Sequence, residues 1–64
     1  MPKEPERTAA YFRAEAMRVR GEAERASSER VRRQLLTMAA GYDALAETAG
    51  TIERQRRGLR PADQ

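Results

Sequence analysis

The sequence predicts an all-α fold: a two-helix antiparallel hairpin that dimerises into a four-helix bundle. Apolar residues recur at alternating intervals of three and four in both halves of the chain, which is the spacing of a helical seam. A serine pair separates the two halves and interrupts this spacing. With only 64 residues, the chain is too short to bury two apolar stripes inside one monomer.

The first helix is predicted over residues 5–26. Pro5 suits the first turn, where its missing N–H costs nothing, and the glutamates beside it favour the positive end of the helix dipole. The seam is rich in alanine, so another helix can approach closely. Its members are Ala9, Phe12, Ala16, Val19, Ala23 and Ala26.

The second helix is predicted over residues 29–56. Gly58 suits its C-terminal cap, and Pro61 cannot continue it. Gly50 offers an earlier stop, with Thr51 capping a short third helix, but an unbroken seam favours one helix. That seam consists of Val31, Leu35, Met38, Tyr42, Leu45, Ala49 and Ile52. The residues that widen it on one side are Leu36, Ala39 and Ala46.

The segment between the helices is Ser27-Ser28-Glu29. Ser28 is a good N-cap residue, and Glu29 suits the first turn of the helix that follows. The interval from Ala26 to Val31 is five residues, which breaks the heptad pattern. These signals predict a tight turn. Because the segment contains no glycine or proline, one bent or continuous helix is the alternative.

Two helices cannot enclose the apolar stripes, whereas a symmetric dimer can. We therefore expect one domain, residues 1–64, with flexible termini at 1–4 and 59–64. We also expect either a homo-oligomer, with a dimer favoured, or binding to the helices of a partner. The predicted interface residues are Phe12, Ala16, Val19, Ala23, Val31, Leu35, Met38, Tyr42, Leu45 and Ile52.

The composition argues against catalysis, metals and cofactors. The chain has no His and no Cys, and its one lysine, Lys3, lies near the N-terminus. The common zinc and di-iron ligand sets are therefore missing. A carboxylate would need a cleft to act as a general base, which a two-helix chain does not provide, and Ser27 and Ser28 have no base nearby in sequence to activate them. No apolar run approaches the ~20 residues of a membrane span. We expect a cytoplasmic, non-catalytic protein that needs no cofactor and no membrane.

Arginine accounts for all but one of the 13 basic residues. Helical spacing predicts ion pairs on the exterior. The predicted pairs are Glu15–Arg18, Glu22–Arg25, Glu29–Arg33 and Glu53–Arg57. The C-terminal cluster of Arg54, Arg56, Arg57 and Arg60 suggests an alternative function, the binding of RNA or DNA phosphates. A plainer explanation is that these residues complement the dipole at the helix C-terminus.

Several motifs carry a resemblance to a known group. They are Tyr11-Phe12-Arg13-Ala14-Glu15-Ala16, Ala23-Glu24, Arg32-Arg33-Gln34-Leu35-Leu36, Met38-Ala39 and Tyr42-Asp43-Ala44-Leu45-Ala46-Glu47. Over residues 11–47 the chain resembles short uncharacterised helical-hairpin proteins of rhizobia and related alphaproteobacteria, with a YxxRA…RxxLLxxAxxYxxLAE-like pattern. The proline common in the turn of that group is absent here. The resemblance implies a helical hairpin and no particular activity.

The predicted function is therefore a small helical protein-interaction or oligomerisation module. The alternative is a nucleic-acid-binding hairpin that uses the C-terminal arginines.

Overall fold

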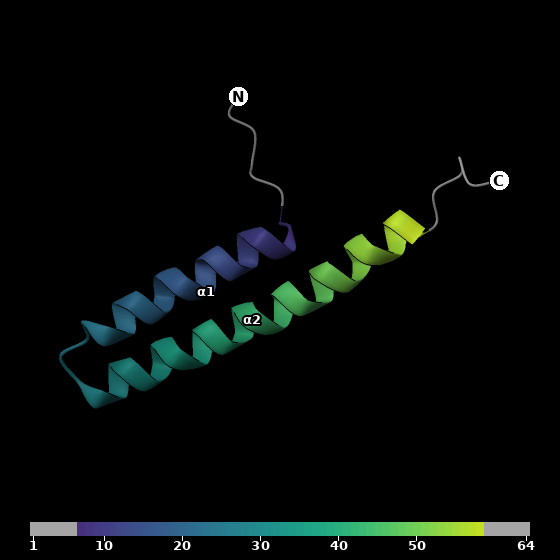
Figure 1. The fold of residues 1–64 in the computed structure, drawn as a ribbon. Helices are drawn as coiled ribbons and strands as arrows, with labels where there is room; N and C mark the ends of the chain where they lie inside the picture. Colours follow the sequence, from purple (N-terminus) through teal and green to yellow (C-terminus); the bar gives the residue numbers. More distant parts are fainter. Residues whose placement is uncertain (1–6, 59–64) are drawn as a thin grey trace, which may run out of the picture.

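The computed structural model describes residues 7–58, which form two antiparallel helices joined by a short connection (Figure 1). Helix α1 spans Ala9–Glu24 and helix α2 spans Glu29–Gly58. The predicted all-α hairpin is confirmed. We call the end at which α1 begins and α2 finishes the open end, and the end with the connection the loop end. At the open end α2 runs past the start of α1 (Figure 1).

Helix α1 begins later than predicted because Thr8 caps it. The Thr8 backbone is extended, and its side-chain oxygen accepts a hydrogen bond from the Tyr11 N–H at 3.1 Å. Arg7 and Thr8 are not helical, so the predicted start near residue 5 is wrong. Pro5 itself lies outside the described residues.

Helix α1 also ends earlier than predicted, at Glu24 rather than near residue 26. The Arg25 N–H donates to the Glu22 carbonyl at 3.1 Å, and the Ala26 N–H donates to the Ala23 carbonyl at 3.2 Å. These bonds span three residues instead of four, which tightens the last turn and closes the helix.

Ser28 caps α2 as predicted. Its side-chain oxygen accepts from the Val31 N–H at 3.1 Å, and its carbonyl accepts from the Arg32 N–H at 3.0 Å. No residue from 7 to 58 has a positive φ, so the chain reverses direction without a left-handed residue. This explains how a connection without glycine or proline forms a hairpin.

Helix α2 passes through Gly50 without a break, so the predicted single helix is confirmed. Gly50 is buried, and a Cβ atom built there would lie 3.8 Å from the Ala9 Cβ. The glycine thus marks the point where the start of α1 meets α2. Helix α2 ends at Gly58, two residues later than predicted, and the predicted stop at Pro61 lies outside the described residues.

The core between the helices is built from alanine. Ala9, Ala16 and Ala23 recur every seven residues on α1, and Ala39 and Ala46 do the same on α2; all five are at most 3% exposed. We call these five residues the alanine seam. The largest fully buried side chain is Val19, and Leu35 and Tyr42 pack against this core. Small side chains let the two backbones approach closely, but they bury little apolar area.

Candidate interaction surface

Five large apolar residues of α2 are exposed, and four of them form one line, with Leu36 on another side of the helix. Val31, Met38, Leu45 and Ile52 recur every seven residues and are 45%, 49%, 48% and 46% exposed. We call them the α2 stripe. Met38 and Leu45 each precede a member of the alanine seam by one residue. Because one residue rotates an α-helix by about 100°, the stripe runs beside the seam and is turned away from α1.

The structure divides the predicted interface residues into two groups. Six face the hairpin core: Ala16, Val19 and Ala23 are buried, and Phe12, Leu35 and Tyr42 are partly buried. The other four, which form the α2 stripe, are about half exposed in the hairpin that residues 7–58 form. The predicted seam of α2 is therefore shared between an intramolecular contact and an exposed surface, and the predicted dimer stays a prediction.

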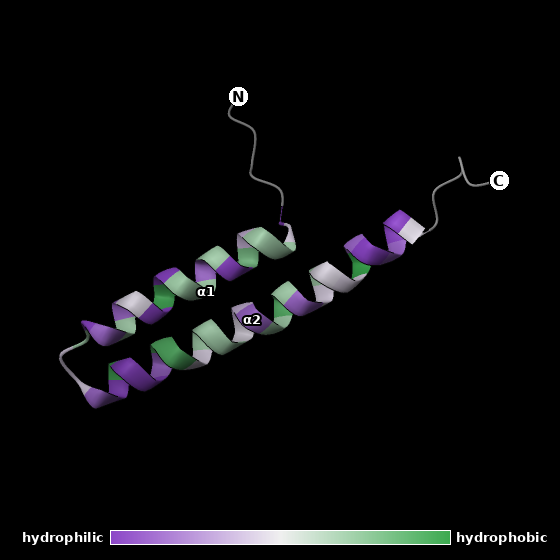
Figure 2. Ribbon diagram, viewed as in Figure 1, coloured by the Kyte–Doolittle hydropathy of each residue, from purple (hydrophilic) through white to green (hydrophobic). Residues whose placement is uncertain are grey.

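The middle of the α2 stripe, around Met38 and Leu45, is nearly free of charge, whereas charged residues flank Val31 and Ile52 at its two ends. From residue 34 to residue 52 the only charged side chains are Asp43 and Glu47, whereas α1 carries six in 16 residues. Asp43 forms an ion pair with Arg20 of α1, and Glu47 lines a groove on that same flank, away from the stripe. The hydrophilic colour accordingly gathers toward the two ends of α2 (Figure 2).

A shallow apolar hollow lies at the middle of the stripe. Met38, Gly41, Tyr42 and Leu45 line it. A Cβ atom built on Gly41 would have no heavy atom within 4 Å, so packing inside the hairpin does not require glycine there. Glycine within a helix costs about 1 kcal/mol relative to alanine. Gly41 therefore lowers the stability of α2, and packing within the described hairpin gives no reason for a glycine at this position.

The Tyr42 ring, which lines this hollow, belongs to a chain of aromatic contacts with α1. The Phe12 and Tyr42 rings stack with centroids 6.4 Å apart and an interplanar angle of 28°. Tyr11 meets Phe12 edge to face, with centroids 5.2 Å apart. The stacking fixes the Tyr42 ring at the boundary between the hairpin core and the stripe.

Ion pairs cover the exterior of α1. Arg18 donates to Glu15 at 2.8 Å, as predicted, and to Glu22 at 2.6 Å. Glu22 therefore pairs with Arg18 and not with Arg25 as predicted, because the Arg18 side chain lies between the two carboxylates. The hydrogen bond to Glu15 raises the pKa of the Arg18 guanidinium further, so it stays charged.

A second group of ion pairs lies at the start of α2. Glu29 accepts from Arg32 and, at 3.3 Å, from Arg33, which confirms the predicted Glu29–Arg33 pair. The hydrogen bond from Arg32 holds the pKa of the Glu29 carboxyl below its usual 4.5, and the Arg32 charge adds to this. The ionised carboxylate also suits the positive end of the α2 dipole.

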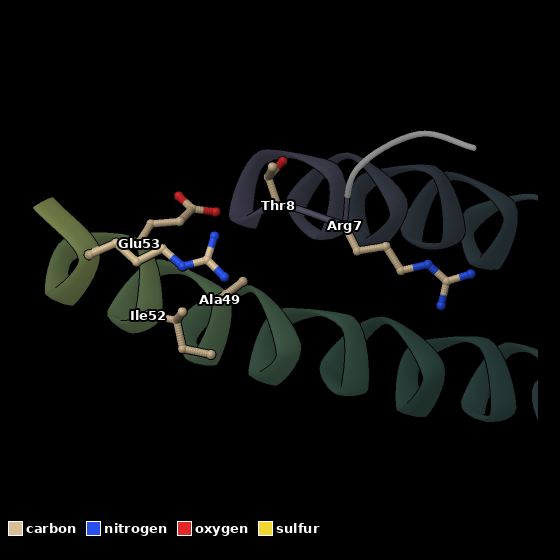
Figure 3. Close-up of a pocket in the computed structure, with 6 residues that line it drawn as sticks. Arg7, Thr8, Ala49, Ile52 and Glu53 are labelled. Carbon is tan, nitrogen blue, oxygen red and sulfur yellow. The ribbon is translucent and has the colours of Figure 1, made fainter. Parts of the chain in front are cut away.

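Glu53 has a role that the sequence reading missed. Its carboxylate accepts a hydrogen bond from the Ala9 N–H at 2.9 Å, instead of pairing with Arg57 as predicted. The carboxylate thus reaches across from α2 and satisfies one of the unpaired amides at the start of α1 (Figure 3). Because 44 residues separate the two partners, local spacing does not reveal this contact.

Arginines gather at the open end. Arg54, Arg56 and Arg57 are exposed on the last turns of α2, as the C-terminal cluster requires, and Arg60 lies outside the described residues. Arg7 and Arg13 join them, because they line the same shallow grooves as these three. The Arg7 side chain extends away from Glu53 in the close-up (Figure 3). Sequence reasoning missed Arg7 and Arg13 because they lie some 40 residues earlier in the chain.

Within 7–58 no three acidic, histidine or cysteine side chains gather into a group that could hold a metal ion. In the same part of the chain, neither helix combines the length and the apolar character needed to cross a bilayer.

Comparison with known proteins returns no family model, no curated protein and no solved structure that matches the chain. The inferences about function therefore rest on the surfaces described above.

Proposed function

We propose that this chain is a non-catalytic helical interaction module that self-associates through the α2 stripe into a four-helix dimer. The observation that carries the proposal is the exposure of four large apolar residues at seven-residue intervals along one helix. A line with this spacing matches the seam through which helices pack in bundles. Dimerisation would cover it, while the alanine seam holds each hairpin together.

The size of the stripe indicates how strong the association is. Four half-exposed side chains present on the order of a few hundred Å² of apolar surface, which is as large as the biggest patch on an ordinary monomer. A standard stable interface buries about 800 Å² on each partner. The flanking Leu35 and Tyr42 would add to the contact. We therefore expect a weak to moderate dimer, with a Kd on the order of micromolar.

The thin core of the hairpin supports the same proposal. A chain of this size gains stability from disulfides, metals or oligomerisation. It has no cysteine, and the side chains of the alanine seam bury little area. Dimerisation would bury the larger side chains that the hairpin leaves exposed and so stabilise the fold.

Sedimentation equilibrium across a concentration series, in low and high salt, tests the proposal. The wild-type chain should move from monomer to dimer, and high salt should not weaken an apolar contact. Met38→Glu should keep the chain monomeric at every concentration. Met17→Glu is the matched control, because Met17 is an even more exposed methionine on α1, away from the stripe. A wild-type monomer at all concentrations, or equal effects of both substitutions, would overturn the proposal.

Nucleic-acid binding is a second candidate function. The observation in its favour is that Arg7 and Arg13 lie beside Arg54, Arg56 and Arg57 at the open end. None of the five guanidinium groups is within salt-bridge distance of a carboxylate of residues 7–58. Phosphate contacts by such groups release counterions and give salt-dependent affinity.

A fluorescent single-stranded RNA and a DNA duplex would test this second candidate. If the open end binds phosphates, replacing Arg54, Arg56, Arg57 and Arg60 with Gln should abolish binding and flatten its salt dependence. The control replaces Arg25 and Arg30 at the loop end with Gln, which should change little. No measurable binding by the wild-type chain at low salt, or unchanged binding by the fourfold variant, would remove this candidate.

We also propose a cytoplasmic location and membership of the alphaproteobacterial hairpin group. The absence of cysteine fits a reducing compartment. The resemblance over residues 11–47 supports the membership. Fractionation of a cell that expresses the tagged full chain tests the location: recovery in the membrane pellet would contradict it.

A further inference from the structure

We propose that the partner on the α2 stripe is a second copy in antiparallel orientation, with the two-fold axis crossing α2 between Gly41 and Tyr42. This inference rests on the proposed function and adds an occupant, an orientation and a register to it. Three independent features of the described surface lead to it: matched side-chain sizes, the hollow at Gly41, and the distribution of charge.

The side chains of the stripe match one another in size about this axis. In the proposed register Val31 lies opposite Ile52 of the second copy, so two β-branched residues meet near each end. Met38 lies opposite Leu45, so two unbranched-at-Cβ residues of similar volume meet nearer the centre. A two-fold interface must be self-complementary, because each pair occurs twice. The order of residues along the stripe meets this requirement.

The hollow fits the same axis. Gly41 of one copy would lie opposite Tyr42 of the second copy, so the smallest residue of the surface receives the largest. Tyr42 already lines this hollow with Met38 and Leu45, and its ring is held by stacking on Phe12. The space around Gly41, which nothing in the hairpin fills, would then hold the edge of the second copy's ring. This gives a physical reason for a glycine in the middle of an exposed helical face.

Charge separates the antiparallel arrangement from the parallel one. A parallel pair would bring two open ends together, each with five arginines. An antiparallel pair holds the open ends apart by nearly the length of α2, which is about 45 Å for a 30-residue helix. That separation exceeds the Debye length of about 8 Å at physiological salt, so the repulsion is screened.

A second copy of α2 also suits the stripe better than a charged helix of another protein does. The surface between residues 34 and 52 has no charged group facing the stripe side that would recognise a charged partner. A second α2 presents an equally uncharged middle section with the same spacing of apolar residues. The mutual absence of charge avoids burying an unpaired ion at the interface.

Disulfide trapping tests the register directly, because the natural chain contains no cysteine. Two full-length variants, Val31→Cys and Ile52→Cys, are oxidised separately and as an equal mixture at concentrations where the chain is dimeric. The proposed register places the two cysteines opposite each other only in the mixture, within the roughly 4.4–6.8 Å between Cα atoms that a disulfide allows. We expect at least tenfold more cross-linked dimer in the mixture than in either variant alone.

Other outcomes are equally informative. Cross-linking of each variant with itself would show a parallel pair and overturn the inference, although the proposed function would stand. A dimer in sedimentation without cross-links in the mixture would mean that Val31 and Ile52 do not face each other, which overturns the register but not the proposed function. A wild-type chain that stays monomeric at every concentration would overturn the proposed function together with this inference.

Substitution of Gly41 provides a second measurement. Gly41→Gln should leave the hairpin helical, because a Cβ atom there contacts no other part of the described hairpin, but the new side chain would block the Tyr42 ring of the second copy. We expect the dimer Kd to rise at least 100-fold. The control is Ala40→Gln, an exposed neighbour on the other side of α2, which should change the Kd less than threefold. An unchanged Kd in Gly41→Gln would overturn the proposed register.

Discussion

Helix α2 carries two parallel lines of apolar residues that differ in size and in surroundings. Ala39 and Ala46 face α1 and are almost fully buried, whereas the α2 stripe beside them is half exposed. Both lines recur every seven residues. The hairpin thus closes over the small residues of the first line and leaves the four larger residues of the stripe half exposed. The comparison shows that the bulkiest apolar line of a helix need not mark its contact inside the monomer.

The reason is geometric. Two helices pack most closely when both present small side chains, and α1 presents Ala9, Ala16 and Ala23. A larger side chain on the facing line of α2 would push the helices apart and break the contact of Gly50 with Ala9. In the described hairpin, neither helix fully covers the stripe residues. The second hairpin of a four-helix bundle would cover them.

The largest effect is expected from enlarging the alanine seam. Ala39→Leu inserts a side chain where Ala16 and Val19 already pack, and such overpacking costs about 1–3 kcal/mol. Thermal unfolding followed by circular dichroism should show a clear fall in Tm. Ala40→Leu, at the exposed neighbouring position, should leave Tm nearly unchanged. Equal Tm values for the two variants would contradict the assignment of the seam.

Truncating the stripe should separate association from folding. Leu45→Ala removes exposed apolar area that the second copy would cover in the proposed dimer, so the dimer should weaken by about 1 kcal/mol or more for each copy of the residue. The helicity of the dilute monomer should change little. Sedimentation and circular dichroism on the same samples check both statements. A large loss of monomer helicity with an unchanged Kd would mean that Leu45 stabilises the hairpin and not the dimer, which contradicts the proposed role of the stripe.

Removing the Glu53 carboxylate should loosen the open end. Glu53→Gln weakens a charge-assisted hydrogen bond to the Ala9 N–H, and loss of such a cap costs about 1 kcal/mol. Amide hydrogen exchange should accelerate in the first turn of α1 but not at the loop end. Glu47→Gln is the control, since Glu47 is exposed and has no such contact with α1. Uniform acceleration along both helices would show that the contact is not a local cap.

The smallest effect concerns acid sensitivity at the loop end. The pKa of Glu29 is lowered in the folded chain, so its contribution to stability is present at pH values above the unfolded pKa, near 4.5. That contribution is lost as the pH falls through the lowered folded pKa. As the pH falls below 5, the helicity of the wild-type chain should therefore fall more than the helicity of Glu29→Gln. The reason is that only the wild-type chain has a carboxylate at this position to protonate. Parallel titration curves would contradict the proposed role of the Arg32 hydrogen bond.

Much of the fold follows from sequence, because its signals are local. Ser28 acts as an N-cap within three residues of its partner, and the seven-residue periodicity of both halves specifies two helices. Pro5 predicts a start of α1 near residue 5, but the side chain of Thr8 makes the actual cap. The choice between two apolar lines on α2 depends on how closely the helices approach, which periodicity alone does not give.

The candidate site was predicted less completely than the fold. All four stripe residues were among the expected interface residues, since heptad spacing selects them. Their exposure follows from tertiary packing of the alanine seam and was not foreseen. The Glu53 contact and the grouping of Arg7 and Arg13 with the C-terminal arginines join segments far apart in sequence. Contacts of that kind leave no local pattern.

The most direct test of the central claim compares two methionines within one chain. Met17 and Met38 are both exposed in the hairpin, but only Met38 belongs to the stripe. Their methyl resonances can be followed by NMR with a paramagnetic solvent agent while the protein concentration is raised. We predict that the Met38 methyl becomes protected as the dimer forms and that the Met17 methyl stays accessible. Unchanged accessibility of Met38 at concentrations where the chain associates would contradict the account.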